Sequence, residues 1–139
     1  MNKVASNLSK ALATLGRVGL LIDESAHLKN GNHSIGVSRQ NAGCIGKVDN
    51  CQVAVYGALS TGNYYQLIDC ELYLSKSWTQ EQKRCKKAGI PKERINHKDK
   101  GELALEIVKR QPAQEIHFDW LGADGFMEMI AGCLVSWTN

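Results

Sequence analysis

Val18-Gly19-Leu20-Leu21-Ile22 is a short, uninterrupted apolar run that is followed directly by Asp23-Glu24. A continuous and partly β-branched run of this length is typical of a strand that is covered on both faces. The sequence therefore predicts a buried strand over residues 18–22 that stops at an acidic pair. Ligand sites in open α/β sheets form at the carboxyl ends of strands, so the end of this strand is a candidate site.

Three further apolar runs predict strands. Residues 51–59 and 64–74 are joined by Ser60-Thr61-Gly62-Asn63, which has the composition of a tight turn, and together they predict a hairpin. The last run, residues 116–121, is followed by Gly122-Ala123-Asp124. A second carboxylate is thus expected just past the end of a strand.

Helices are predicted between these strands. Thr79 followed by Gln82 has the form of a capping box, and Gly89 with Pro91 ends that helix. Asp99 opens a second helix, whose apolar face is Leu103, Ala104, Ile107 and Val108. A third helix is predicted near the N-terminus from the helical spacing of Val4, Leu8, Leu12 and Leu15. This element order predicts an α/β fold, with a mixed sheet flanked by helices.

The composition bounds the class of protein. A chain of 139 residues with 43% apolar and 22% charged residues fits one globular domain over residues 1–139. No apolar run approaches the roughly 20 residues of a membrane span, so we expect no membrane association. Five cysteines without C-x-x-C spacing indicate reduced thiols in the cytoplasm, mostly buried and inert.

The positive charge is unevenly distributed. The net charge is only +3, from 17 Lys or Arg and 14 Asp or Glu. Residues 25–48 contain no acidic residue but carry Lys29, Arg39 and Lys47, and residues 76–100 hold nine Lys or Arg against three acidic residues. Two interpretations remain open, namely chance clustering on a solvated surface and a surface that neutralises phosphates.

Asp23 and Asp124 could share a metal ion. Carboxylates from two neighbouring strand ends suit Mg²⁺, which prefers oxygen ligands. The alternative is that each aspartate caps the turn or helix that follows it. Asp119 competes with Asp124 but lies inside the apolar run, and Glu24 would point to the opposite face from Asp23. The tryptophans are interpreted as core or capping residues in preference to base-stacking platforms: Trp78, Trp120 and Trp137.

The first strand and its acidic end also open an ordered series of sequence blocks. These are Leu21-Ile22-Asp23-Glu24-Ser25, Ser34-Ile35-Gly36-Val37-Ser38-Arg39-Gln40, Gly46-Lys47-Val48-Asp49-Asn50-Cys51-Gln52-Val53, Leu72-Tyr73-Leu74 with Trp78-Thr79, Arg84 with Lys87-Ala88-Gly89-Ile90-Pro91, Glu102-Leu103-Ala104-Leu105 and Gly122-Ala123-Asp124. In this order they resemble the DDE-superfamily endonuclease domain of bacterial insertion-sequence transposases. The resemblance covers residues 18–126.

This resemblance implies a ribonuclease-H-like fold, with Asp23 as the first catalytic and metal-binding aspartate and Asp124 as the second. It implies Mg²⁺ or Mn²⁺ as cofactor and DNA as partner, because such enzymes cut transposon ends and join the exposed 3′ hydroxyl to target DNA. Arg39, Gln40 and Lys47 fall in the family's basic block and, with Lys29, are candidates for phosphate contacts. A role in holding the loop is the alternative for that block.

The sequence also departs from the family. It lacks the usual Gly-Phe pair after Asp23, having Ala26-His27, and after Asp124 it reads Gly125-Phe126-Met127-Glu128 and stops at Asn139. The third carboxylate of the family is then missing unless Glu128 replaces it. We expect a truncated copy without the C-terminal part of the fold, weak or inactive as a nuclease. The alternatives are a DNA-binding or regulatory remnant, acting as a homo-oligomer or paired with intact transposase, and an unstable by-product without a role.

Overall fold

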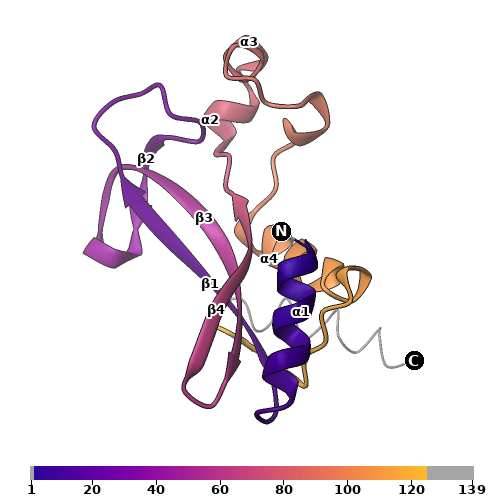
Figure 1. Cartoon of the computed structure of the whole chain (residues 1–139). Helices are drawn as coiled ribbons and strands as arrows, with labels where there is room; N and C mark the ends of the chain where they lie inside the picture. Colours follow the sequence, from indigo (N-terminus) through magenta and orange to yellow (C-terminus); the bar gives the residue numbers. More distant parts are fainter. Residues whose placement is uncertain (1, 125–139) are drawn as a thin grey trace. The chain divides into compact units, whose positions relative to one another are not determined.

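The computed structural model describes residues 2–124 (Figure 1). The expectations for Glu128, Cys133 and Trp137 lie outside these residues. The helices and strands, in chain order, are α1 (Asn2–Ala13), β1 (Gly19–Leu28), β2 (Ser38–Ala42), β3 (Lys47–Thr61), β4 (Tyr64–Leu72), α2 (Lys76–Thr79), α3 (Gln82–Lys87), α4 (Lys100–Arg110) and β5 (Trp120–Ala123). Short 3-10 turns occupy Gly43–Ile45, Lys92–Arg94 and Pro112–Gln114.

The strands form one mixed sheet. Its order is β2-β3-β1-β5, and β4 pairs with β3. The pair β1 and β5 is parallel, whereas β2 and β3 are antiparallel. The predicted fold class, α/β with a mixed sheet flanked by helices, is confirmed. No helix in the described part of the chain is long and apolar enough to cross a membrane.

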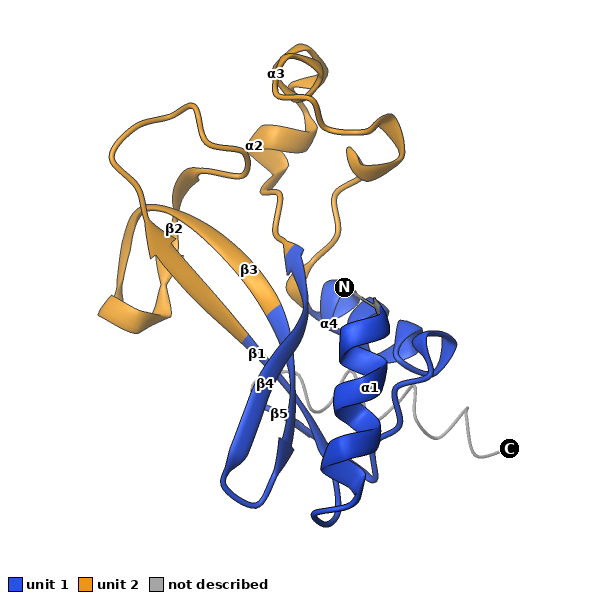
Figure 2. Ribbon diagram, in the orientation of Figure 1, with its two compact units in different colours: residues 1–23, 56–71, 101–139 blue, residues 24–55, 72–100 orange. Residues whose placement is uncertain are grey.

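The chain divides into two compact units (Figure 2). Unit 1 comprises residues 1–23, 56–71 and 101–139, and unit 2 comprises residues 24–55 and 72–100. Strands β1 and β3 contribute residues to both units. Each unit is described by itself, and the single domain expected for residues 1–139 stays a prediction.

The core of unit 1 joins β1, β3 and α4. Leu20 and Ile22 of β1 are buried, as are the four predicted apolar residues of α4. Gly57 of β3 lets α4 approach the sheet closely, because a Cβ at this glycine would lie 2.8 Å from Ile107 Cγ2 and 3.6 Å from Ile22 Cδ1. The apolar face predicted for this helix is therefore correct and packs on the strand that carries Asp23.

Helix α1 buries a different face from the predicted one. Val4 is 75% exposed and Leu15 lies beyond the helix end, whereas Leu12 is buried as expected. The small residues Ala5, Ser6 and Ser9 are buried beside Leu12. The Ser9 hydroxyl both donates to the His117 carbonyl and accepts from the His117 N–H, each at 3.2 Å. These hydrogen bonds compensate the burial of a polar side chain, which apolar spacing alone could not reveal.

Unit 2 is built around Trp78 and the hairpin of β2 and β3. Trp78 is 1% exposed, and its indole N–H donates to the Val37 carbonyl at 2.8 Å. The guanidinium of Arg84 lies 3.8 Å from the Trp78 ring centroid and also donates to the Asn32 carbonyl at 2.9 Å. Trp78 is thus a core residue, as predicted, and it fastens the loop before β2 to α2 and α3.

Some predicted boundaries are wrong. Strand β1 continues past Asp23 to Leu28, because β3 is long enough to pair beside it, and just beyond β1 the Lys29 N–H donates to the Asn50 carbonyl at 3.0 Å. Strand β2, which is polar, was not predicted. The capping box at Thr79 is also wrong: this residue belongs to α2, its hydroxyl lies 3.4 Å from the Lys76 carbonyl, and Glu81 precedes α3.

Candidate metal centre

The parallel pair β1 and β5 brings the two predicted aspartates to the same level of the sheet. The pairing runs from Gly19 opposite Trp120 to Ile22 opposite Ala123. Asp23 and Asp124 are the next residues of the two segments. The two aspartates are therefore neighbouring positions of the paired segments, with Asp23 inside β1 and Asp124 just after β5.

Contacts between the strands identify the face that carries the aspartates. A Cβ built on Gly122 would lie 2.9 Å from Leu21 Cδ2, so Leu21 and Gly122 project to one face. Side chains alternate along a strand, which places Asp23 on the face of Leu21. Ile22 projects to the other face, where α4 packs. The Asp23 carboxylate therefore projects from the face opposite α4.

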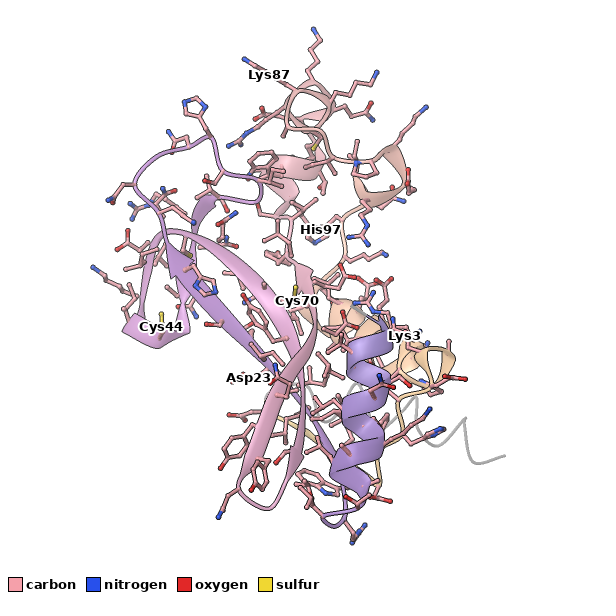
Figure 3. All side chains as sticks on the ribbon, in the orientation of Figure 1. Lys3, Asp23, Cys44, Cys70, Lys87 and His97 are labelled. Atoms are coloured by element: carbon pink, nitrogen blue, oxygen red, sulfur yellow. The ribbon has the colours of Figure 1, made fainter. Side chains whose placement is uncertain are left out.

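Asp23 lies within β1 and not at its end, which corrects the prediction (Figure 3). Asp124 is the residue directly after β5, as predicted. Both aspartates are exposed. The neighbouring Glu24 forms an ion pair with Lys100 at 2.7 Å.

The donor set suits a hard divalent cation in part. Two carboxylates can hold Mg²⁺ when water and substrate oxygens fill the other positions. Within residues 2–124, no group of three or more His, Cys, Asp or Glu side chains could together hold a metal ion. The described residues thus supply two candidate ligands for such a site, Asp23 and Asp124.

Asp119 fixes the pairing of β5 with β1. The Val18 N–H donates to Asp119 Oδ2 at 2.7 Å, and the Asp119 N–H donates to the Val18 carbonyl at 2.7 Å. The prediction that Asp119 lies inside the strand is wrong, because β5 begins at Trp120. A short acidic side chain that precedes a strand commonly bonds to nearby main chain, and this was the available signal.

Comparison with known proteins assigns the family. The family model described as DDE superfamily endonuclease matches residues 2–127, a span that includes both Asp23 and Asp124. The chain belongs to the DDE endonuclease superfamily. Searches of curated proteins and of solved structures found no match. The predicted DDE endonuclease domain is confirmed.

The basic side chains predicted to contact DNA belong to unit 2 of this DDE domain. Lys29, Arg39 and Lys47 are exposed, the last two on β2 and β3. Lys47 Nζ lies 3.3 Å from Asp49 Oδ2. The hydrogen bond from the Asn50 N–H, followed by the one from Lys47, lowers the pKa of the Asp49 carboxyl. Lys47 is therefore partly neutralised by Asp49. Arg39 lies opposite Asn50, the residue after Asp49, and its charge also lowers the pKa of the Asp49 carboxyl.

Gln40, the fourth predicted DNA contact, is engaged with the main chain. Its side-chain amide donates to the Cys51 carbonyl at 2.8 Å and lies 3.4 Å from the Gly36 carbonyl. The oxygen of the same amide is buried without a hydrogen-bond partner. These contacts favour the interpretation in which Gln40 holds the loop of the DDE domain.

A polar cluster between β4 and α4 was missed from the sequence. Arg110 donates from Nε and Nη2 to the two oxygens of Asp69, at 2.6 and 2.9 Å, and from Nη1 to Glu71 at 2.6 Å. Gln111, which is fully buried, donates to Asp69 at 2.8 Å. Burial lowers the pKa of Arg110 and the hydrogen bonds to Asp69 and Glu71 raise it, and the net change is upward. The cluster has the contacts of a structural ion pair that ties α4 to the sheet of the DDE domain.

Proposed function

We propose that the chain derives from an insertion-sequence transposase whose activity is metal-dependent cleavage and transfer of DNA strands. Asp23 and Asp124 are the proposed catalytic residues and ligands for Mg²⁺ or Mn²⁺. The observation that supports the proposal is the register of β1 and β5, which pairs Ile22 with Ala123, the residues directly before the two aspartates, within the span that matches the family. A DNA-cutting enzyme of a bacterial cell acts on DNA in the cytoplasm, where we place the chain.

The two carboxylates require a cation before they can accept DNA. Carboxylate and phosphodiester oxygens are both ligands that Mg²⁺ accepts, so a divalent ion can bridge the two aspartates and the DNA. A divalent ion bound there supplies the charge that activates the attacking oxygen and stabilises the leaving oxygen of a phosphodiester. The task of Asp23 and Asp124 is to hold that charge on one face of the sheet.

We expect this chain alone to cleave weakly or not at all. The resemblance to the family implies three carboxylates, and Asp23 and Asp124 are the two that fall within residues 2–124. A site held by two carboxylates instead of three would have less charge where the displacement develops it, an effect of about several kcal/mol. Association with a second copy or with an intact transposase is part of the same proposal.

The second candidate function is DNA binding without cleavage. Exposed Lys29, Arg39 and Lys47 favour it, because basic side chains supply most of the affinity for a phosphate backbone. Binding of this kind would weaken steeply with salt. A gel shift of transposon-end DNA that is lost at high salt, without cleavage in Mg²⁺, would support this candidate over the first.

The test of the first candidate is Mn²⁺ binding by calorimetry, followed by incubation with labelled transposon-end DNA. The variants Asp23→Asn and Asp124→Asn remove one charge each and keep the size of the side chain. Glu115→Gln, at an exposed position of unit 1, is the matched control. We expect Mn²⁺ affinity to fall about tenfold or more in each Asn variant, about 1.4 kcal/mol, and to be unchanged in the control. Equal affinity in all four proteins would overturn the proposal.

A further inference from the structure

Trp120, the first residue of β5, is not a core residue, the first of the two roles predicted for the tryptophans. It is 41% exposed, whereas Trp78 is 1% exposed. An indole is the largest apolar side chain, and its exposed part is a planar surface on which a flat ligand could stack. Trp120 shares its strand with the residues that lead to Asp124.

The indole rests on two glycines. A Cβ built on Gly19 would lie 2.1, 2.3 and 2.5 Å from the Cζ2, Cε2 and Cη2 atoms of Trp120, and a Cβ on Gly122 would lie 3.1 Å from Cζ3. The six-membered ring therefore occupies the space that side chains would fill on both strands. One side of the indole packs against the main chain at these glycines, and the rest of the side chain is exposed to solvent.

The seat of the indole lies beside the aspartates on the same face. Gly122 and Asp124 are two residues apart, as are Leu21 and Asp23. Residues with this spacing project to one face and are separated by about 7 Å along a strand. That separation is comparable to the length of one extended nucleotide, so a phosphate at the aspartates would place a neighbouring base over the ring.

We propose that Trp120 is a stacking platform for an unpaired nucleobase next to the phosphate held at Asp23 and Asp124. The inference rests on the proposed function and deepens it by assigning a binding position to the DNA strand. Every base has a π-face, so stacking on Trp120 tolerates any sequence. The base must be unpaired, because a base inside a duplex already stacks on its neighbours.

Charge distinguishes this occupant from others. The two carboxylates repel a nucleic acid strand unless a divalent cation is bound, so stacking on Trp120 must depend on the cation. An apolar peptide or a second copy of the chain carries no phosphate and would cover Trp120 with or without the metal. Dependence on both the base and the cation is therefore the signature of the proposed site.

The experiment measures binding of a short single-stranded oligonucleotide to the full chain by fluorescence anisotropy, in Mn²⁺ and after chelation. Trp120→Leu removes the π-face, and Trp120→Phe retains one. Tyr65→Leu removes another exposed aromatic side chain, 70% exposed on β4, and is the matched control. An abasic oligonucleotide of the same length removes the bases but keeps the phosphates.

In Mn²⁺ we expect Trp120→Leu to weaken binding about 5-fold to about 150-fold, the range for loss of one stacked base. Trp120→Phe should lose less, and Tyr65→Leu should bind like the wild type. The abasic strand should bind the wild type more weakly and should not distinguish wild type from Trp120→Leu. Circular dichroism of each variant separates loss of stacking from loss of folding, and a folded Trp120→Phe keeps the test valid if Trp120→Leu unfolds.

Two results would overturn the inference in different ways. If Asp23→Asn and Asp124→Asn abolish Mn²⁺ binding but Trp120→Leu binds the oligonucleotide like the wild type, the platform is wrong and the proposed function stands. If Trp120→Leu weakens binding equally in Mn²⁺ and in chelator, and the Asn variants bind Mn²⁺ normally, the placement beside a metal-held phosphate is wrong together with the proposed function.

Discussion

Val18 and Asp119 hold each other by two reciprocal hydrogen bonds, each 2.7 Å long. The pair lies one residue before the first partners of β1 and β5, and the register that it starts ends at Ile22 and Ala123, directly before Asp23 and Asp124. A slip of one residue in a strand moves every side chain to the other face. Asp119 is therefore a residue on which the geometry of the candidate metal centre depends, although it projects no ligand to it.

Replacement of Asp119 should weaken both the fold and the metal centre. Asp119→Ala leaves the Val18 N–H without its partner, and we expect the free energy of unfolding to fall by about 1 to 2 kcal/mol. Asp119→Asn keeps an oxygen acceptor and should lose less. Urea unfolding gives the stability, and Mn²⁺ calorimetry gives the effect on the centre. A fall in stability that is the same for Asn and Ala would contradict the role of the acceptor.

Gly19 and Trp120 should be energetically coupled. A Cβ at Gly19 would lie 2.1 Å from the ring, so Gly19→Ala must displace the indole or the strand. We expect Gly19→Ala to cost about 1 to 3 kcal/mol, a typical range for overpacking. In the double variant Gly19→Ala/Trp120→Ala the added methyl group meets no ring, so the cost of Gly19→Ala should largely disappear. A double-mutant cycle in urea measures this coupling, and additive effects would show that the contact is absent in solution.

The sequence predicted the strands and helices that have an apolar pattern within their own residues. Continuous apolar runs located β1 and the hairpin of β3 and β4, and apolar spacing located the buried face of α4. Strand β2 has the sequence Ser38-Arg39-Gln40-Asn41-Ala42, without apolar alternation, and it exists because β3 pairs with it. Its formation depends on a partner strand, and no propensity within the segment could reveal that.

Asp23 and Asp124 stay predicted site residues. A carboxylate after each apolar run made them candidates, and the resemblance to the family favoured a metal site over capping of the following turn. Their common level depends on Val18 and Asp119, which are 101 residues apart in sequence. Trp120 was interpreted as a core or capping residue, and only the neighbouring glycines of two paired strands show where its ring lies. Contacts between residues far apart in the chain account for each of these differences.

Arg110 should be a major contributor to the stability of unit 1. Asp69 is half-buried and Glu71 is buried, and Arg110→Met removes the cation that both contact. We expect the free energy of unfolding to fall by about 3 to 5 kcal/mol. Arg110→Lys keeps the charge but cannot contact both oxygens of Asp69 at once, so its free energy of unfolding should lie between those of the wild type and Arg110→Met. Lys109→Met, on the exposed side of the same helix, is the control and should change stability by less than about 0.5 kcal/mol. Equal midpoints for the Met variants in urea would refute this role.

Gln40 should affect stability more than DNA binding. Gln40→Leu removes the donor to the Cys51 carbonyl inside unit 2, and we expect a loss of about 1 to 3 kcal/mol. Arg39→Gln removes an exposed charge on the same strand and should leave stability nearly unchanged while weakening DNA binding. Urea unfolding and a gel shift at two salt concentrations separate the effects. Weaker DNA binding by a fully stable Gln40→Leu would instead assign Gln40 to the phosphate contacts.

The cysteines should divide into two classes by their rate of alkylation. The sequence analysis expected most of them to be buried and inert. Cys44 and Cys70 are exposed (Figure 3), whereas Cys51 and Cys85 are buried. Burial, and next the charge of Asp49, raises the pKa of the Cys51 thiol, so this thiol stays protonated at neutral pH. Alkylation requires the thiolate. Timed iodoacetamide labelling at pH 7, read by mass spectrometry of peptides, should modify Cys44 and Cys70 first and Cys51 only after unfolding in urea. Native labelling of Cys51 as fast as Cys70 would show that the β2 and β3 hairpin opens readily.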